Sequence, residues 1–376
     1  MKILVVGNGG REHTLAWKLA NDSAKPELFC TPGNAGTAEL GTNLDFAATD
    51  LKGIQGWCAE NKPDLVVIGP EATLCAGLTD MLEADGLRVF GPCQAAAELE
   101  GSKQFAKEIM KAAGVPTSAY ETFTDPDEAC AYVRERGAPI VIKADGLAAG
   151  KGVTVAETVE QAEAAIRDAL EGNAFGDAGN RVVIEDFLVG EEASILALID
   201  GDNIVMLASS QDHKRIFEKD EGPNTGGMGA YSPASIVNET VLKKVKEEVY
   251  DRTLAELKKR GITYKGVLYA GLMIENDQPS VVEFNCRFGD PETQAVLARW
   301  DGDMLPAING VIDGNLSEDL IEWKDEHSVC VVMVAGGYPG DYAKGNEVQN
   351  IAKANAVEDT FVFHAGTALD GDKVVT

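Results

Sequence analysis

The first hundred residues alternate between short apolar runs and stretches in which apolar residues recur with helical spacing. The runs predict buried strands at 2–6, 28–30, 65–68 and 88–90, and Leu15 and Leu19 lie on one stripe of a predicted helix at 11–21. Strands that alternate with helices indicate a doubly wound α/β sheet, whose ligands bind at the carboxyl ends of the strands. Gly9, Gly10 and the turns 32–34 and 69–71 all fall at such ends, so we expect them to share one rim.

The same pattern continues through the rest of the chain. Strands are predicted at 139–144, 153–156, 181–188, 195–199, 205–209, 267–274, 281–285 and 328–334, and a strand begins at 373–376. Helices are predicted at 103–113, 159–170, 238–259 and 304–312. Residues 190–194 are expected to connect two strands, and 211–215 to end the strand at 205–209. Residues 222–229 contain four glycines in eight positions and are predicted to be an irregular loop.

Three polar side chains at the end of the strand near 281–285 are the first candidates for chemistry. Glu283, Asn285 and Arg287 are two residues apart, so they share one face of a strand. Carboxylate and amide oxygens suit Mg²⁺, and a guanidinium suits a phosphoryl group. A half-buried strand with a solvated polar face is the alternative. The following Gly289-Asp290-Pro291 favours a site.

Lysines next to glycines provide a second set of candidates. Lys143 lies near the end of an apolar strand, and Lys151 lies in the small-residue stretch 145–153, which predicts a hairpin over phosphates. A strand follows this hairpin, whereas a Walker A loop leads into a helix. An ordinary glycine-rich hairpin is the alternative. Lys103 and Lys107 are one turn apart on a helix, a spacing that is also typical of solvated surface.

Composition excludes several classes of function. The net charge of −28 argues against a nucleic-acid partner, which needs basic surface. Seven scattered cysteines, no CxxC and four histidines favour neither disulfides nor a zinc site. No apolar run is long enough to span a membrane, so a cytoplasmic protein is expected. An NAD-dependent dehydrogenase is disfavoured because Glu12 stands where GxGxxG needs its last glycine.

Several long motifs occur in a familiar order. They are GNGGREH at 7–13, GSK at 101–103, IKADGLAAGKGV at 142–153, VIEDFLVGEEAS at 183–194, SQDHKR at 210–215, GPNTGGMGAYSP at 222–233 and EFNCRFGDPETQ at 283–294. Together they resemble the phosphoribosylamine–glycine ligase family of ATP-grasp enzymes. The resemblance implies an N-terminal α/β domain at 1–102, an ATP-grasp domain at 103–325 with a mobile lid at about 118–190, and a C-terminal α/β domain at 326–376. That family continues past Thr376, so the last domain is expected to be incomplete.

The resemblance also implies roles for individual residues. ATP would contact Lys103, Lys143, Gly150, Lys151, Gly152, Val153, Glu185, Asp186, Phe187, Leu188 and Glu192, with Mg²⁺ or Mn²⁺ on Glu283 and Asn285. Catalytic contacts would come from Arg287, Asp212, Lys214 and Asp290. The substrate would lie against Gly9, Gly10, Asn34, Glu71, Asn224 and Thr225. Gly271 stands where wider relatives carry another metal-binding glutamate, which leaves a second metal site open.

The implied reaction has two steps and small-molecule partners. The carboxylate of glycine attacks the γ-phosphorus of ATP, and the amine of 5-phosphoribosylamine then displaces phosphate from glycyl phosphate. A monomer without nucleic-acid or membrane partners is expected. Another ATP-grasp carboxylate–amine ligase is one alternative, and a nucleotide-binding form impaired by the missing tail is another.

Overall fold

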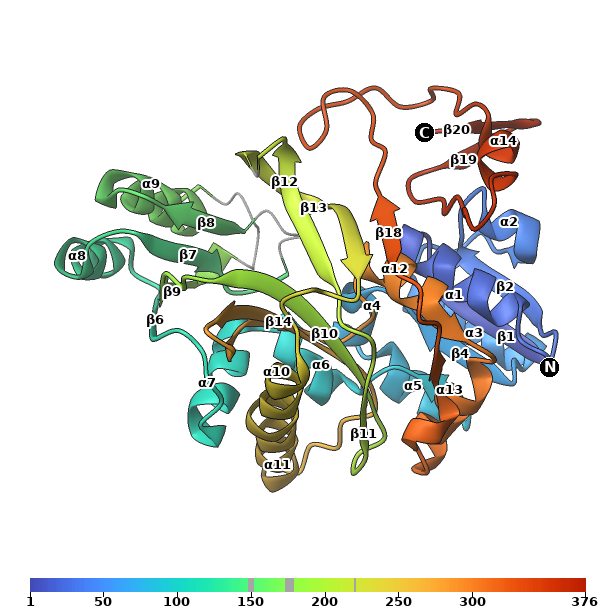
Figure 1. Cartoon of the computed structure of the whole chain (residues 1–376), viewed down its shortest axis with the longest axis horizontal. Helices are drawn as coiled ribbons and strands as arrows, with labels where there is room; N and C mark the ends of the chain where they lie inside the picture. Colours follow the sequence, from blue (N-terminus) through green and yellow to red (C-terminus); the bar gives the residue numbers. More distant parts are fainter. Residues whose placement is uncertain (148–151, 173–178, 220) are drawn as a thin grey trace.

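The N-terminal part of the protein is a parallel sheet wrapped by helices. We describe a computed structural model, which covers residues 1–147, 152–172, 179–219 and 221–376 (Figure 1). The strands are β1 (Lys2–Gly7), β2 (Glu27–Pro32), β3 (Thr42–Asn43), β4 (Leu65–Ile68) and β5 (Val89–Phe90), and the helices are α1 (Gly10–Ala20), α2 (Thr37–Leu40), α3 (Leu51–Asn61), α4 (Glu71–Cys75), α5 (Leu78–Ala84) and α6 (Gln94–Gly101). The sheet order is β3-β2-β1-β4-β5 with parallel pairing throughout. The doubly wound prediction is confirmed.

A small antiparallel sheet follows, with its own hydrophobic core. The elements are α7 (Lys103–Ala113), β6 (Tyr120–Phe123), α8 (Pro126–Arg136), β7 (Ile140–Ala144), β8 (Val153–Ala156), α9 (Val159–Leu170) and β9 (Val182–Asp186). Their strand order is β6-β9-β7-β8. Ala129, Val133, Ile142, Ile166 and Ile184 are among the buried residues that join α8 and α9 to this sheet. In Figure 1 it lies at the end of the molecule opposite the N-terminus.

A larger antiparallel sheet lies between these two parts. It consists of β10 (Glu191–Ile199), β11 (Ile204–Met206), β14 (Gly266–Glu275) and β15 (Gln278–Asn285), in the order β11-β10-β14-β15. The predicted helix at 238–259 is α10 (Glu239–Lys244), a π-helical turn (Val245–Tyr250) and α11 (Asp251–Lys259). Val281 N donates to Pro116 O over 2.8 Å, so β15 is tied to the segment that enters the small sheet. The prediction that 190–194 is a connection was wrong, because β10 begins at Glu191 and pairs with β14 along its length.

A fourth sheet contains two segments that the sequence did not reveal as strands. It consists of β12 (Gln211–Phe217), β13 (Glu221–Ser232) and β18 (Ser328–Val331). The prediction of an irregular loop at 222–229 was wrong, since β13 pairs with strands on both sides. Residues 211–215 form their own strand and do not end the strand near 205–209. Gly227 has φ +127°, and a Cβ there would collide with Pro291, so glycine allows β13 to approach the 289–291 turn.

The remaining elements cover the fourth sheet and the N-terminal part. They are α12 (Glu292–Arg299), β16 (Trp300–Asp301), α13 (Leu305–Asp313), a 3₁₀ turn (Glu318–Leu320), β17 (Glu322–Trp323), α14 (Ile351–Asn355), β19 (Ala368–Asp370) and β20 (Lys373–Val375). Helix α12 contacts α1, β13 and β18, so it joins the N-terminal part to the fourth sheet. No helix in the described ranges is both long and apolar enough to span a membrane.

Candidate active site

Two lysines and a glutamate form a buried ion-pair group between α7 and the small sheet. Lys143 on β7 and Lys107 on α7 each place Nζ 2.9 Å from a different carboxylate oxygen of Glu185 on β9. Lys143 Nζ also donates to Val282 O over 3.0 Å, which aims it toward β15. Burial alone would raise the pKa of Glu185, but Lys143 and Lys107 lower it below its ordinary value. Two cations share one anion, so the group keeps an excess positive charge for an anionic ligand.

Lys103 begins α7 at the mouth of the predicted phosphate hairpin. Ser102 caps this helix, and Lys103 Nζ donates to Gly146 O over 3.0 Å. Gly152 is buried, and Val153 starts β8 next to Lys143. Burial lowers the pKa of Lys103, while the nearby Glu283 opposes this effect. Gly150 and Lys151 lie outside the described residues.

The 185–188 segment, predicted to border adenine, is partly engaged by other parts of the protein. Asp186 N donates to Ala119 O over 2.9 Å, so this group is already paired within the sheet. The side chain of Asp186 forms an ion pair with Arg136 on the surface, and Phe187 is exposed. The backbone beyond Asp186, at Phe187 and Leu188, follows the end of β9. Any free edge for a base therefore begins at Phe187.

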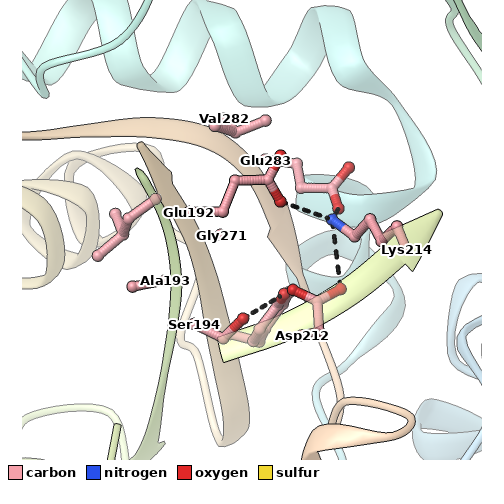
Figure 2. Close-up of a pocket in the computed structure, with 10 residues that line it drawn as sticks. Glu192, Ala193, Ser194, Asp212, Lys214, Gly271, Val282 and Glu283 are labelled. Atoms are coloured by element: carbon pink, nitrogen blue, oxygen red, sulfur yellow. Dashed lines mark hydrogen bonds and ion pairs between the residues drawn. The ribbon is translucent and has the colours of Figure 1, made fainter. Parts of the chain in front are cut away.

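Lys214 lies among carboxylates in a small pocket between the larger antiparallel sheet and the fourth sheet. Its Nζ is 3.5 Å from Glu192, 3.6 Å from Asp212 and 3.9 Å from Glu283 (Figure 2). Burial alone would lower the pKa of Lys214, but Asp212 and Glu283 raise it well above its ordinary value. The residues that line this pocket are Glu192, Ala193, Ser194, Asp212, Lys214, Tyr269, Gly271, Leu272, Val282 and Glu283. Thr225 on β13 lies beside it, with its hydroxyl donating to Lys214 O over 2.8 Å, and Asn224 precedes it on the same strand.

Glu283 and Asn285 at the end of β15 offer hard oxygen ligands. Glu283 lines the pocket, and burial alone would raise its pKa, but Lys214, Lys143 and Lys103 lower it. In the described ranges no group of three or more His, Cys, Asp or Glu side chains is arranged to hold a metal. Two protein oxygens, of which that of Glu283 is close to the lysines, fit a Mg²⁺-like ion that takes its remaining ligands from phosphates and water. The residues thus fit a divalent metal bound together with a nucleotide.

Arg287 links β15 to the N-terminal part of the molecule. Its Nη2 is 2.8 Å from Glu100 and donates to Asn285 Oδ1 over 3.2 Å, and its Nε is 3.2 Å from Glu71. Burial alone would lower the pKa of Arg287, but Glu100 and Glu71 raise it above its already high ordinary value. The guanidinium is therefore permanently charged and held in place. Glu71, predicted from the rim of the first sheet, is brought to the end of β15.

The glycine turn after β1 is also engaged by residues distant in sequence. Gly9 N donates to Glu12 Oε2 over 2.6 Å, and Arg11 N donates to Asp290 Oδ2 over 3.2 Å. A Cβ at Gly10 would come within 2.5 Å of Gln294 Nε2, so this turn needs glycine for close approach to α12. The predicted residues Gly9, Gly10 and Asp290 thus lie together.

Asn34 joins this turn to the C-terminal part of the chain. Its Nδ2 donates to Asn8 O over 2.9 Å and to His364 O over 2.8 Å. His364 N donates in turn to His13 Nδ1 over 2.7 Å, and Trp17 packs against Phe361. Burial lowers the pKa of His13 to about 4, which keeps the ring a neutral acceptor. The 361–364 segment therefore covers the rim where substrate residues were predicted.

Comparison with known proteins identifies the family of this chain. Sequence models of phosphoribosylglycinamide synthetase match it in three parts: the N domain at residues 1–100, the ATP-grasp (A) domain at 101–293 and the C domain at 328–376. The chain belongs to the phosphoribosylglycinamide synthetase family. The ATP-grasp fold is generally associated with ATP and divalent metal ions, in agreement with the lysines and oxygen ligands above.

Individual relatives agree with this assignment to the synthetase family. The phosphoribosylamine–glycine ligase of Escherichia coli O157:H7 is 51% identical over 380 residues, which cover 100% of this chain and 88% of the relative. The crystal structure of the Thermotoga maritima phosphoribosylamine–glycine ligase has a TM-score of 0.86 at 34% identity, covering 100% of this chain and 90% of the other. A biotin carboxylase from Campylobacter jejuni, 17% identical with a TM-score of 0.70 over 93% of this chain and 79% of its own, shares the fold.

Several residues of the site were missed from the sequence. Lys107 matches the helical spacing of solvated surface, yet it is buried against Glu185. Glu100 lies at the end of α6, and nothing in the local sequence indicates that its partner is Arg287. Glu292 was quoted within a motif but given no role, although it is buried beside the pocket. The signal for all three is a charged residue on an otherwise apolar face, which becomes informative once the partner element is known.

Proposed function

We propose that this chain joins glycine to 5-phosphoribosylamine at the expense of ATP, giving glycinamide ribonucleotide, ADP and phosphate through glycyl phosphate. Membership of the phosphoribosylglycinamide synthetase family over nearly the whole chain is the observation that carries this proposal. The likeness to E. coli phosphoribosylamine–glycine ligase over the full chain supports the same purine-biosynthesis reaction. The division into domains at 1–102, 103–325 and 326–376 is part of the proposal.

The buried lysines would position the triphosphate. Lys143 and Lys103 face the end of β15, where Lys143 already donates to Val282 O. Glu283 and Asn285 would hold Mg²⁺ or Mn²⁺, which supplies charge neutralisation on the phosphates when it is bound. Phosphoryl transfer depends mainly on such positioning, so no protein nucleophile is needed. Glu192 would accept from the ribose hydroxyls, and the backbone after β9 would border the base.

Arg287 and the Lys214 pocket would then serve the acyl phosphate. Arg287 is permanently charged and is held between Glu71, Glu100 and Asn285, which suits an oxyanion that forms during transfer. Asp212, Lys214 and Thr225 would border glycine, with Asn224 next to them. Gly9, Gly10, Asn34, Glu71 and Asp290 would border the phosphoribosylamine. Exclusion of water matters here because an acyl phosphate hydrolyses readily.

An ADP-release assay with freshly made phosphoribosylamine tests the proposal directly. We expect ADP release only when glycine, phosphoribosylamine and a divalent metal are all present. Replacing glycine with alanine, acetate or bicarbonate should reduce the rate strongly. Tight ATP binding without glycine-dependent ADP release would overturn the proposal. A monomer is proposed as well, and sedimentation equilibrium tests that part independently.

A further inference from the structure

A buried carboxyl group lies directly behind the pocket that contains Lys214. Glu292 is the first residue of α12 and is 3% exposed. Its Oε1 accepts from Tyr269 Oη over 3.0 Å and from Ser194 Oγ over 3.4 Å. These two hydroxyls are 2.9 Å apart, so either can donate to the other in place of its bond to the carboxylate. Glu292, Tyr269 and Ser194 therefore form a closed triangle of side chains that can exchange protons.

The two hydroxyls connect this carboxyl group to the pocket. Ser194 on β10 and Tyr269 on β14 both line the pocket. Figure 2 shows Ser194 there with Asp212, Lys214 and Glu283. Glu292 is not among the residues that line the pocket, but its hydrogen bonds with Ser194 and Tyr269 connect it to the pocket.

Charged groups on every neighbouring element act on Glu292. Burial and the nearby Asp212 on β12 raise its pKa to about 7, against the opposing effect of Lys214 and Arg287. Cys330 on β18 is close enough for Glu292 to raise its pKa, and the guanidinium of Arg11 on α1 is paired with Glu12. Tyr269 responds in the same direction, since burial and Glu292 raise its pKa well above the ordinary value. The phenol thus stays protonated and can pass a proton on without acting as the final acceptor.

We propose that Glu292 is the acceptor for the proton that the attacking amine loses during amide formation, with Ser194 and Tyr269 as the relay. The proposal rests on the proposed function. In this step the amine nitrogen forms a bond to the carbonyl carbon of glycyl phosphate, and the bond from that carbon to the phosphate oxygen breaks with its electron pair on phosphate. The proton leaves nitrogen for a relay hydroxyl, and that hydroxyl gives its own proton to the Glu292 carboxylate.

The other carboxylates of the pocket are less suited to this task. Glu192, Asp212 and Glu283 all face the Lys214 ammonium within 4.0 Å. These three carboxylates are therefore already engaged by the ammonium group. A general base works best when its pKa is near the working pH, and it must be connected to the reacting atom by hydrogen bonds. Glu292 meets both conditions.

Glu292→Gln is the first test, because glutamine keeps the shape and can still accept from Tyr269 but cannot take up a proton. Amide formation should fall by about 100-fold or more. The acid limb of the pH profile of kcat/KM for phosphoribosylamine should disappear between about pH 5.5 and 8.5. Formation of glycyl phosphate, followed by glycine-dependent positional isotope exchange in ATP, should remain within about twofold, because no amine proton is lost in that step.

Tyr269→Phe and Ser194→Ala provide a second test that does not remove the carboxyl group. Each should lower amide formation more than isotope exchange, and the double variant should approach Glu292→Gln. An unchanged acid limb in Glu292→Gln would overturn the proposal. So would an equal loss of both partial reactions, which indicates a structural role. If Glu292→Gln does not fold, unchanged ratios in the two hydroxyl variants would overturn it instead. A wild-type protein without glycine-dependent isotope exchange would contradict the proposed function, not the role of Glu292.

Discussion

Replacing Lys107 with methionine tests whether the buried ion-pair group serves the nucleotide. Lys107 is 2% exposed; its Nζ is 2.9 Å from Glu185 and donates to Ser118 and Thr117 over 2.8 Å. Breaking a buried pair by removing one partner costs about 3–5 kcal/mol. Glu185 keeps Lys143 and also the Ser118 hydroxyl at 2.7 Å, so we expect a smaller loss of about 2 kcal/mol in the free energy of unfolding.

The same substitution should weaken nucleotide binding. Without Lys107, Glu185 pairs with Lys143 alone, and the group loses the positive charge left over for phosphates. We expect the Kd for MgATP to rise about tenfold, which corresponds to about 1.4 kcal/mol. The pKa of Lys107, lowered by burial to about 8, still leaves it charged at neutral pH, so the wild-type protein has this charge under assay conditions.

Urea unfolding and titration calorimetry measure the two effects, and Lys111→Met is the matched control. Lys111 lies one turn further along α7 and is exposed, and its Nζ is 5.8 Å from the centroid of the Tyr120 ring, compared with 5.7 Å for Lys107. Its substitution should change unfolding by no more than about 0.5 kcal/mol and should leave Kd unchanged. Identical results for the two variants would refute the reasoning, because the buried group would then carry neither stability nor affinity.

Three further predictions concern the proposed metal ligand Glu283, a histidine and two glycines. Glu283→Gln should reduce ligation by about 100-fold or more with little change in unfolding, as should removal of metal with EDTA, and Glu275→Gln on the exposed end of β14 is the control. Because His13 is neutral when folded, with a pKa of about 4, the unfolded chain binds more protons below about pH 6.5; stability should fall by about 2 kcal/mol from pH 6.5 to 5, and less in His13→Gln. Gly7→Ala should destabilise by about 1–3 kcal/mol, because Gly7 has φ +127° and its Cβ would meet Glu12, whereas Gly56→Ala in α3 should stabilise by about 0.5–1 kcal/mol.

Each of these has an outcome that contradicts it. Near-normal turnover in Glu283→Gln would remove its assignment as a metal ligand. If stability depended on pH in the same way in His13→Gln as in the exposed His327→Gln, the His13 ring beneath the 361–364 segment would not be the group that titrates. Equal effects of alanine at Gly7 and Gly56, measured by urea unfolding, would show that backbone strain does not decide the turn after β1.

Local sequence patterns predicted most strands and helices because their signals are local. The run from Lys2 to Val6 is apolar since β1 is buried on both faces, and the helix from Lys103 to Ala113 has a serine cap and ends at a glycine. β13 could not be predicted in this way. Its glycines weaken any strand signal, and it becomes regular because β12 and β18 supply hydrogen-bond partners.

The site was predictable where it follows one strand and hidden where it depends on distant contacts. Glu283, Asn285 and Arg287 have an alternation that is visible in the sequence, and the structure brings Arg287 to Asn285. Glu100, in contrast, is 186 residues from the backbone group of Cys286 that it accepts from. Patterns among neighbouring residues carry no information about such distant pairs. A residue such as Glu100 therefore could not be told from an ordinary surface charge.

The contact between His13 and His364 has a consequence for how the protein is made. The two residues are 351 positions apart. After Phe90 completes the first sheet, about 270 residues remain up to His364, and at a synthesis rate of about 5–20 residues per second they take roughly 15–55 seconds. During that interval Trp17 and the turn holding Asn34 face water without the 361–364 segment. A nascent chain paused before residue 361 would therefore expose an aromatic surface that chaperones can bind, even though its parallel sheet is already complete.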